Sequence, residues 1–274
     1  MEERKINRII KGTQTTDGGG VTLKRLIAGS ELNMLDPFLL LDEFGSNNPK
    51  DYIAGFPPHP HRGFETITYM INGKFRHEDT AGNKGYLKDG SVQWMTAGKG
   101  VVHSEIPEQS KGLLRGFQLW LNLPKSKKFI EPKYQDIPSN KIPIVKIPEG
   151  SVKIIAGSFN NKKGPGNPHS KMSYFDIVLR PNNNICIPIK DGWNGFCYVY
   201  EGDIESNKKL SNGNLGVLNN HGTFKCKSND KTSRFILVSG EPLNEPVARG
   251  GPFVMNTKEE LLQAFKDYQS GLLK

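Results

Sequence analysis

The chain is poor in cysteine and contains no long apolar run. Its 274 residues include three cysteines, Cys186, Cys197 and Cys226, without a Cys-x-x-Cys spacing. An odd number with no pairing or metal-binding pattern predicts free thiols in a reducing compartment. No apolar run reaches the ~20 residues that span a bilayer, and the charged N-terminus leads into no apolar signal segment. We therefore expect a cytoplasmic protein, or a nuclear one in a eukaryote, without a membrane partner.

The sequence also lacks amphipathic helical patterns, except near its C-terminal end. There Thr257 and Glu260 predict a capping box, and Leu261, Phe265 and Tyr268 follow one stripe of a helix. We expect this stripe to pack on the body of the protein. The rest of the chain, with 30 glycines and 18 prolines, predicts many short strands and turns. The expected fold class is therefore all-β.

The formal net charge of +9 raises the question of nucleic-acid binding. Basic residues gather loosely around Lys125–Lys128 and Lys225–Arg234. No helix-turn-helix pattern, zinc-finger spacing or basic stretch with interleaved aromatic residues accompanies them. We interpret them as a solvated surface and expect no direct nucleic-acid partner, while docking to an acidic protein stays open.

The most informative stretch runs from Gly55 to Glu105 and contains two short clusters, His59-Pro60-His61 and His103-Ser104-Glu105. Side chains at i and i+2 of a strand point to the same face, about 6.5–7 Å apart. Each cluster therefore offers two donors to one side of a strand. If the two strands are neighbours in one closed sheet, three imidazoles and a carboxylate meet inside it, which predicts a metal site.

Strands are predicted on both sides of these clusters. Alternating or continuous apolar patterns mark the segments 21–27, 35–44, 64–71, 92–95 and 117–123. Asn72-Gly73, after the third segment, predicts a hairpin. In the last segment Gln118, Trp120 and Asn122 share one face, opposite a row of apolar side chains. Residues 125–148, rich in proline and lysine, predict an irregular connection between two halves.

The second half carries a short repeat of the first. Tyr69-Met70-Ile71-Asn72-Gly73 recurs as Tyr198-Val199-Tyr200-Glu201-Gly202, with the same offset at both Tyr and Gly. That offset places Pro188 and Lys190 where the first half has its two neighbouring histidines. The repeat predicts two similar β-domains, of which only the first keeps metal ligands.

Several longer motifs lie near these positions and near both ends of the chain. They are Pro58-His59-Pro60-His61-Arg62-Gly63-Phe64-Glu65-Thr66, Gln93-Trp94-Met95-Thr96-Ala97-Gly98-Lys99-Gly100, His103-Ser104-Glu105, Leu35-Asp36-Pro37-Phe38-Leu39-Leu40 and Gly251-Pro252-Phe253-Val254-Met255-Asn256-Thr257. Together they resemble the signature of the pirin family, within the cupin superfamily. The resemblance implies a bicupin of two antiparallel jelly-roll barrels with a C-terminal α-helix. We expect a metal-binding cupin domain over 1–130 and a second cupin domain without ligands over 131–274, which ends in the helix.

The resemblance also implies the site. One iron, Fe(II) or Fe(III), is expected per chain, held by His59, His61, His103 and Glu105. The same donors suit other divalent transition metals, including Mn, Co, Ni, Cu and Zn. Four protein donors leave up to two octahedral positions for dioxygen, water or a chelating substrate. Four further residues are expected to surround the ligands, namely Arg62, Glu65, His77 and Gln118.

Two functions from different classes follow from the resemblance. The first is a quercetin 2,3-dioxygenase type of oxidoreductase, in which a flavonol and dioxygen react at the metal and Glu105 accepts the proton of the flavonol hydroxyl. The alternative is a redox-sensitive transcriptional cofactor that docks to a transcription factor without catalysis. A metal-binding stress protein is a third possibility. The protein is expected to be a monomer.

Overall fold

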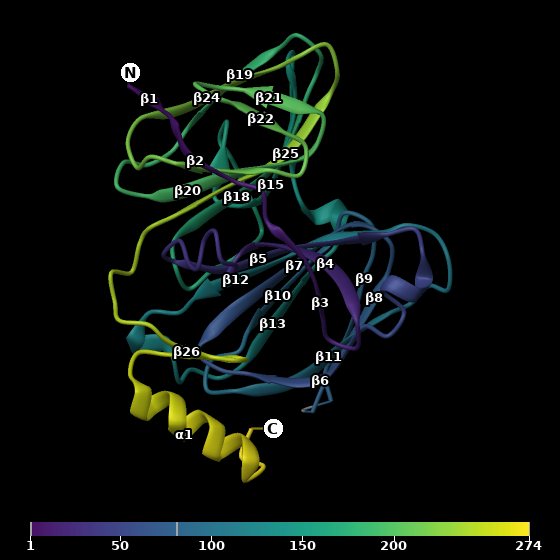
Figure 1. Ribbon diagram of the computed structural model, residues 1–274, viewed down its shortest axis with the longest axis vertical. Helices are drawn as coiled ribbons and strands as arrows, with labels where there is room; N and C mark the ends of the chain where they lie inside the picture. Colours follow the sequence, from purple (N-terminus) through teal and green to yellow (C-terminus); the bar gives the residue numbers. More distant parts are fainter. Residues whose placement is uncertain (1, 81, 274) are drawn as a thin grey trace. The chain divides into compact units, whose positions relative to one another are not determined.

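The computed structural model describes residues 2–80 and 82–273, where β-strands dominate and a single α-helix lies near the C-terminal end (Figure 1). Contacts divide the chain into two compact units. The first unit comprises Thr13–Ala28, Phe38–Ser139 and Leu243–Lys274, and the second comprises Met1–Gly12, Gly29–Pro37 and Asn140–Pro242. The first unit contains the two strands on which the metal ligands were predicted.

Two sheets form most of the first unit. The larger contains, in spatial order, β13 (Lys133–Ile137), β10 (Val92–Thr96), β7 (Phe64–Asn72), β12 (Leu114–Asn122), β5 (Phe38–Ser46), β4 (Val21–Ile27) and β3 (Thr13–Asp17). The smaller contains β6 (Phe56–His61), β11 (Val101–Pro107), β8 (Phe75–Asp79) and β9 (Lys84–Leu87). A short ribbon, β26 (Ala248–Gly250) and β27 (Phe253–Met255), and the 3₁₀ turns η1 (Pro49–Asp51) and η2 (Lys125–Lys127) complete it.

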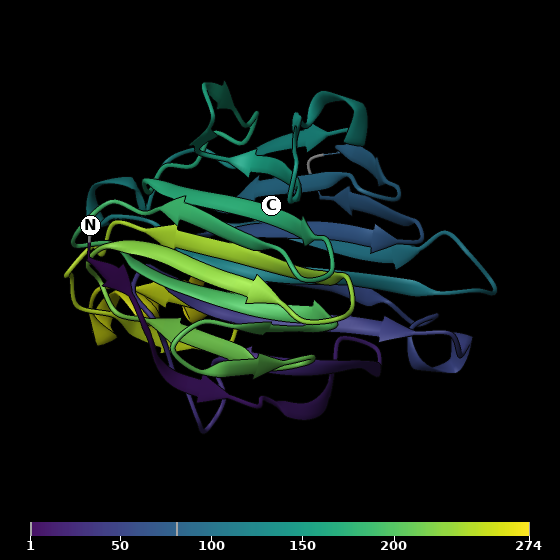
Figure 2. The ribbon, with the colours of Figure 1, turned by 90° about the horizontal axis from the view of Figure 1, so that it is seen from above.

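The second unit is built in the same way. Its larger sheet contains β14 (Ile144–Ile147), β15 (Gly150–Ala156), β18 (Met172–Leu179), β25 (Ser233–Gly240), β20 (Asn194–Glu201), β23 (Leu215–Leu218) and β2 (Ile6–Ile10). Its smaller sheet contains β19 (Asn184–Pro188), β24 (Thr223–Ser228), β21 (Asp203–Glu205), β22 (Lys209–Ser211) and β1 (Glu3–Arg4). The remaining elements are β16 (Ser158–Phe159), β17 (Lys162–Lys163) and the turn η3 (Ser139–Lys141). In Figure 2 strands of the larger sheet coloured green to yellow-green run side by side, as the pairing of β18, β25 and β20 requires.

The two units share one strand order, which confirms the predicted repeat. The order β10-β7-β12-β5-β4-β3 in the first recurs as β23-β20-β25-β18-β15-β14 in the second. The smaller sheets correspond likewise, with β6-β11-β8-β9 matching β19-β24-β21-β22. Tyr69 on β7 and Tyr198 on β20 therefore hold equivalent places. The fold is all-β, a bicupin of two antiparallel jelly-roll barrels.

The expected domain limits, 1–130 and 131–274, differ from the two units at both chain ends. The N-terminal strands belong to the second unit, because β1 pairs with β24 and β2 pairs with β23. The C-terminal helix belongs to the first unit, since it contacts β26 and β27. Backbone pairing and apolar packing at the chain ends thus make both units discontinuous in sequence.

Two expectations about the strands were wrong. The turn at Asn72-Gly73 does not close a hairpin, because β7 pairs with β10 and β12 while β8 pairs with β11 and β9. Both edges of β7 are already occupied, so the turn passes the chain from the larger sheet to the smaller. The segment 125–148 is not wholly irregular either, since it contains β13, which pairs with β10 along its full length, and β14.

The interior of the second barrel is filled by apolar side chains. Its buried cluster is composed of aliphatic, aromatic and cysteine side chains, among them Val152, Ile154, Phe175, Ile177 and Leu237. Cys197 and Cys226 also lie in this cluster, and Cys186 is exposed. All three cysteines are free, as predicted. Apart from these two buried thiols, the cluster contains no side chain that ligates a metal ion.

The C-terminal helix α1 (Lys258–Gln269) forms as predicted. Thr257 accepts from the backbone of Glu260 at 3.1 Å, and the Glu260 carboxylate returns to the Thr257 N–H, which is a capping box. The rings of Phe265 and Tyr268 lie 5.0 and 6.2 Å from that of Phe253 on β27. The apolar stripe therefore packs on the first unit. Within the described ranges, no helix combines the length and apolar character that crossing a membrane requires.

Candidate metal centre and its cavity

Three histidines meet on two neighbouring strands of the first unit. β6 and β11 pair antiparallel with His103 opposite His59. The ring centroids of His59 lie 4.6 Å from His61 and 4.5 Å from His103, and one nitrogen of each ring lies within 4.8 Å of the others. His61 and His103 are buried and His59 is partly exposed. The structure thus brings together three of the four expected ligands.

The imidazole nitrogens of this group fit a metal. Nδ1 of His59 lies 2.8 Å from the Pro57 carbonyl oxygen, which can only accept, so Nδ1 carries the proton and Nε2 keeps its lone pair. Nδ1 of His61 and Nε2 of His103 are buried, and no described residue hydrogen-bonds to either. Burial lowers the pKa of both His61 and His103 well below the usual histidine value, which keeps these rings neutral. Neutral rings with uncommitted buried nitrogens are what a transition metal binds.

Glu105 lines the same cavity, but its carboxylate lies outside the group of three histidines. Oε1 accepts from the Thr68 hydroxyl at 2.9 Å, and Oε2 accepts from Nε2 of Gln118 at 3.1 Å. The pairing of β11 with β6 shifts between His103 and Glu105. The simple alternation that predicted a common cluster is therefore disturbed at this point, and β7 and β12 hold the carboxylate instead.

Gln118, expected among the residues around the ligands, lies against Glu105. Its side-chain oxygen lies 2.6 Å from the Thr68 hydroxyl while its nitrogen donates to Glu105. The Thr68 hydroxyl has a single proton and donates to only one of these two oxygens at a time. Gln118 thus orients the Glu105 carboxylate at the cavity wall.

Arg62 has a different place from the expected one. Nε donates to the Lys99 carbonyl at 2.6 Å and Nη1 pairs with Asp267 at 2.7 Å, so the side chain fastens α1 to the loop after β10. Alternation along the chain explains the difference, because Arg62 follows His61 and points to the opposite side.

Glu65 and His77 also lie outside the cavity lining. Glu65 is fully buried and accepts from the Thr96 hydroxyl at 2.8 Å. His77 stands behind a ligand, with its Nδ1 3.2 Å from Nδ1 of His103. Burial lowers the pKa of His77, so this ring too is neutral. His77 contacts the metal group through His103.

A cavity of about 600 Å³ opens beside the histidines. This volume falls within the ~300–1,000 Å³ of small-molecule sites. Apolar and aromatic side chains contribute much of its wall, namely Leu23, Leu40, Phe44, Phe56 and Trp120. The Trp120 ring lies 5.2 Å from that of His61 and 4.3 Å from that of Phe64, so it connects the metal group to the wall.

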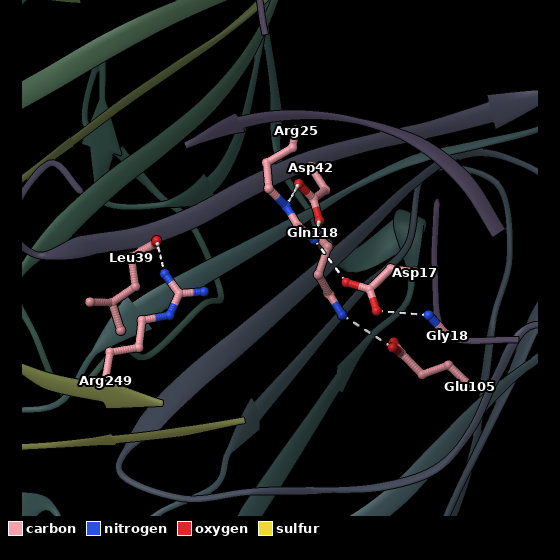
Figure 3. Close-up of polar contacts among 8 residues, drawn as sticks. All are labelled: Asp17, Gly18, Arg25, Leu39, Asp42, Glu105, Gln118 and Arg249. Carbon is pink, nitrogen blue, oxygen red and sulfur yellow. Dashed lines mark hydrogen bonds and ion pairs between the residues drawn. The ribbon is translucent and has the colours of Figure 1, made fainter. Parts of the chain in front are cut away.

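Four charged residues of the cavity were not predicted from the sequence, namely Asp17, Arg25, Asp42 and Arg249 (Figure 3). Arg25 binds Asp42 through Nε and Nη2, at 3.0 and 2.7 Å, and reaches Asp17 at 2.8 Å. Burial raises the pKa of Asp42 to about 6, against the opposing effect of Arg25. These residues come from β3, β4, β5 and β26, and no local motif marks them as one group.

Among its described residues, the second unit has no counterpart of the histidine group. β19 and β24, which correspond to β6 and β11, carry no histidine, aspartate or glutamate. Pro188, which the offset of the repeat placed at the position of His59, is the last residue of β19, and Lys190 lies just beyond the strand. Within the part of the chain that the structure describes, the three histidines are the one group of possible metal-binding side chains found.

Comparison with known proteins agrees with this architecture. Residues 20–121 match the model of the pirin family and residues 174–274 that of the pirin C-terminal cupin domain. A pirin-like protein from Caulobacter vibrioides is 43% identical over 99% of this chain and 99% of its own. The chain belongs to the pirin family.

Two solved structures of the superfamily are similar. Quercetin 2,3-dioxygenase from Acinetobacter baumannii has a TM-score of 0.92 and 32% identity, over 99% of both chains. A bacterial pirin from Escherichia coli, solved in complex with nickel(II), has a TM-score of 0.70 and 19% identity, over 86% of this chain and 99% of its own. At this low identity, the similarity to the Escherichia coli pirin shows a shared fold alone. A pirin-family chain with the fold of a quercetin dioxygenase thus carries three converging histidines at a ligand-sized cavity.

Proposed function

We propose that this chain is a metal-dependent flavonol dioxygenase that cleaves quercetin or a related flavonol at the first unit. One observation carries the proposal. Neutral, buried imidazoles with free nitrogens converge at the wall of a cavity of about 600 Å³, where a carboxylate also lies. The similarity to a quercetin 2,3-dioxygenase along the full chain supports it.

Iron is the proposed metal, with His59, His61 and His103 as ligands and Glu105 as the fourth. Bound there, it would supply the positive charge that acidifies a chelating hydroxyl and the redox capacity that activation of dioxygen requires. Three neutral rings and one carboxylate leave a divalent ion with a net positive charge, which favours an anionic flavonol over a neutral one.

The chain's own residues supply the proton transfer. A carboxylate oxygen of Glu105 accepts the proton of the flavonol hydroxyl, because the lone pairs of the histidine rings are committed to the metal. Gln118 holds this carboxylate by its side-chain N–H at 3.1 Å. Trp120 and Phe56 line the cavity, so they contribute apolar aromatic surface that suits a flat substrate and excludes water from it.

Turnover by metal-loaded protein tests the proposal. Protein stripped of metal is reloaded separately with Fe, Mn, Co, Ni, Cu and Zn, and loss of quercetin absorbance in air is followed. We expect dioxygen-dependent turnover with at least one redox-active metal and none with His103→Ala prepared in the same way. The absence of turnover with every metal, in protein that holds one metal per chain, would contradict catalysis and favour the docking function instead.

A further inference from the structure

Arg249 is a cation without a carboxylate partner in the wall of the cavity. Its Nη1 donates to the Leu39 carbonyl oxygen at 2.8 Å (Figure 3). Its guanidinium carbon lies 5.0 Å from the centre of the Trp120 ring. Arg25 beside it is saturated by Asp42 and Asp17, whereas no described carboxylate pairs with Arg249. The remaining N–H donors of Arg249 are therefore available to a ligand in the cavity.

The surroundings of Arg249 favour an anion. Burial and the nearby charge of Arg25 lower the pKa of Arg249 against the opposing charge of Asp42, which Arg25 already pairs. An arginine side chain nevertheless stays charged at neutral pH. A partly buried charge without a direct ion-pair partner is unfavourable, and a bound anion or acidic oxygen reduces that cost. The planar guanidinium offers paired donors that suit such a group better than a lysine does.

The same tryptophan links Arg249 to the metal group. The ring of His61 lies 5.2 Å from Trp120 on one side, and the guanidinium lies 5.0 Å from it on another. Both distances are measured to the Trp120 ring, so the separation between the His61 ring and the Arg249 guanidinium is at most the sum of the two. One molecule of two or three linked rings can therefore reach both the metal group and Arg249.

We propose that Arg249 selects the ligand of this cavity, which is a flat aromatic molecule with an acidic oxygen at the end remote from the three histidines. The metal group takes the chelating end of the molecule, and Arg249 takes the remote phenolic or carboxylate oxygen. The inference deepens the proposed function, and it rests on that function for the choice of a flavonol as the aromatic molecule.

Two flavonols separate the contribution of Arg249 from that of the metal. Quercetin has the chelating hydroxyl and carbonyl pair and further phenolic hydroxyls, whereas 3-hydroxyflavone has the chelating pair alone. Binding of each is measured without dioxygen by quenching of tryptophan fluorescence in metal-loaded protein, so the readout does not depend on turnover. The variants are Arg249→Met, which removes the charge at similar length, and Arg249→Lys, which keeps the charge but lacks the paired planar N–H donors of the guanidinium. Arg115→Met is the matched control, since Arg115 pairs with Glu43 at 2.6 Å outside this cavity.

The wild type should bind quercetin about tenfold more tightly than 3-hydroxyflavone, as one charge-assisted hydrogen bond predicts. Arg249→Met should abolish this preference and leave the affinity for 3-hydroxyflavone unchanged. Arg249→Lys should retain part of the preference, and Arg115→Met should retain all of it. If Arg249→Met does not fold, a reduced preference in Arg249→Lys at an unchanged melting temperature supports the same conclusion.

An unchanged preference in Arg249→Met, or equal weakening of both ligands, overturns the inference. Failure of the wild type to bind either flavonol overturns it as well. The two proposals fail separately. Turnover of quercetin without a preference that depends on Arg249 leaves the dioxygenase function standing and removes this role of Arg249. Binding that depends on Arg249, without turnover of quercetin, leaves the role of Arg249 standing and removes the dioxygenase function.

Discussion

Nδ1 of His103 lies 3.2 Å from Nδ1 of His77, and this contact joins a candidate metal ligand to the strand behind it. Only one of two such nitrogens can carry a proton. If His103 binds the metal through Nε2, its Nδ1 carries the proton and donates to His77. His77 thereby fixes the tautomer and the orientation of the ligand ring.

His77→Leu should therefore weaken metal binding by about 10- to 100-fold, the usual effect of losing a hydrogen bond that orients a metal ligand. His77→Gln offers an oxygen acceptor at similar length and should restore part of the affinity. The measurement is competition with a chelator of known affinity. His221→Leu, at an exposed histidine of the second unit, serves as the control. Equal affinities for His77→Leu and the wild type would show that the contact is incidental.

The position of the histidine group could be predicted from the sequence, whereas the cavity could not. His59 and His61 are two residues apart on one strand, and His103 lies opposite His59 on the next, so alternation and pairing suffice. Arg249 comes from the C-terminal segment that returns to the first unit, and local pattern carries no information about that return. The register shift after His103, which separates Glu105 from the histidines, is equally invisible in one sequence.

Glu105→Gln tests the role of the carboxylate as a proton acceptor. The amide keeps the size and one oxygen donor, so the variant should retain metal. Turnover of quercetin should fall by about 10²- to 10⁴-fold at matched metal content, because the proton acceptor is gone. Fe(III) in the variant should also be easier to reduce, since an anionic ligand has been replaced by a neutral one. Glu131→Gln, at an exposed carboxylate paired with Lys99, is the control. Wild-type turnover in Glu105→Gln would mean that the base lies elsewhere.

Lys128 is a buried lysine that holds three chain segments together. Its Nζ donates to the Gly63 carbonyl at 2.7 Å, to Oδ1 of Asn122 at 2.6 Å and to the Val254 carbonyl at 2.9 Å. Lys128→Met leaves all three acceptors without this donor and should destabilise the fold by about 2–5 kcal/mol. The melting temperature measures the effect, with Lys125→Met at an exposed lysine as the control. Equal melting temperatures for the two variants would contradict it.

The same lysine predicts a dependence of stability on pH. Burial lowers the pKa of Lys128 to about 7, whereas an unfolded lysine has a pKa of about 10.4. Between these values the unfolded chain binds a proton that the folded chain does not, so the contribution of Lys128 to stability rises with pH from about 7 to about 10. Urea unfolding at pH 7 and pH 10 should show a larger gain for the wild type than for Lys128→Met. Parallel gains would rule out this titration.

The cysteines should differ sharply in reactivity. Cys186 is exposed, while burial raises the pKa of Cys197 well above the usual thiol value and that of Cys226 likewise. A thiol reagent should modify Cys186 alone rapidly in the native protein, and all three cysteines after denaturation. Because no disulfide links them, reductant should leave the melting temperature unchanged. A marked fall on adding reductant would reveal a disulfide.

Carbon monoxide release measured against quercetin consumed tests the central claim most directly. Cleavage of the flavonol ring by one dioxygen molecule places both oxygen atoms in the ester product and expels one carbon monoxide. Wild-type protein loaded with one metal per chain should release one carbon monoxide per quercetin, and His103→Ala, with its metal content measured in parallel, should lose metal and release none. Loss of quercetin without carbon monoxide, or equal release from His103→Ala, would contradict a flavonol dioxygenase site at these histidines.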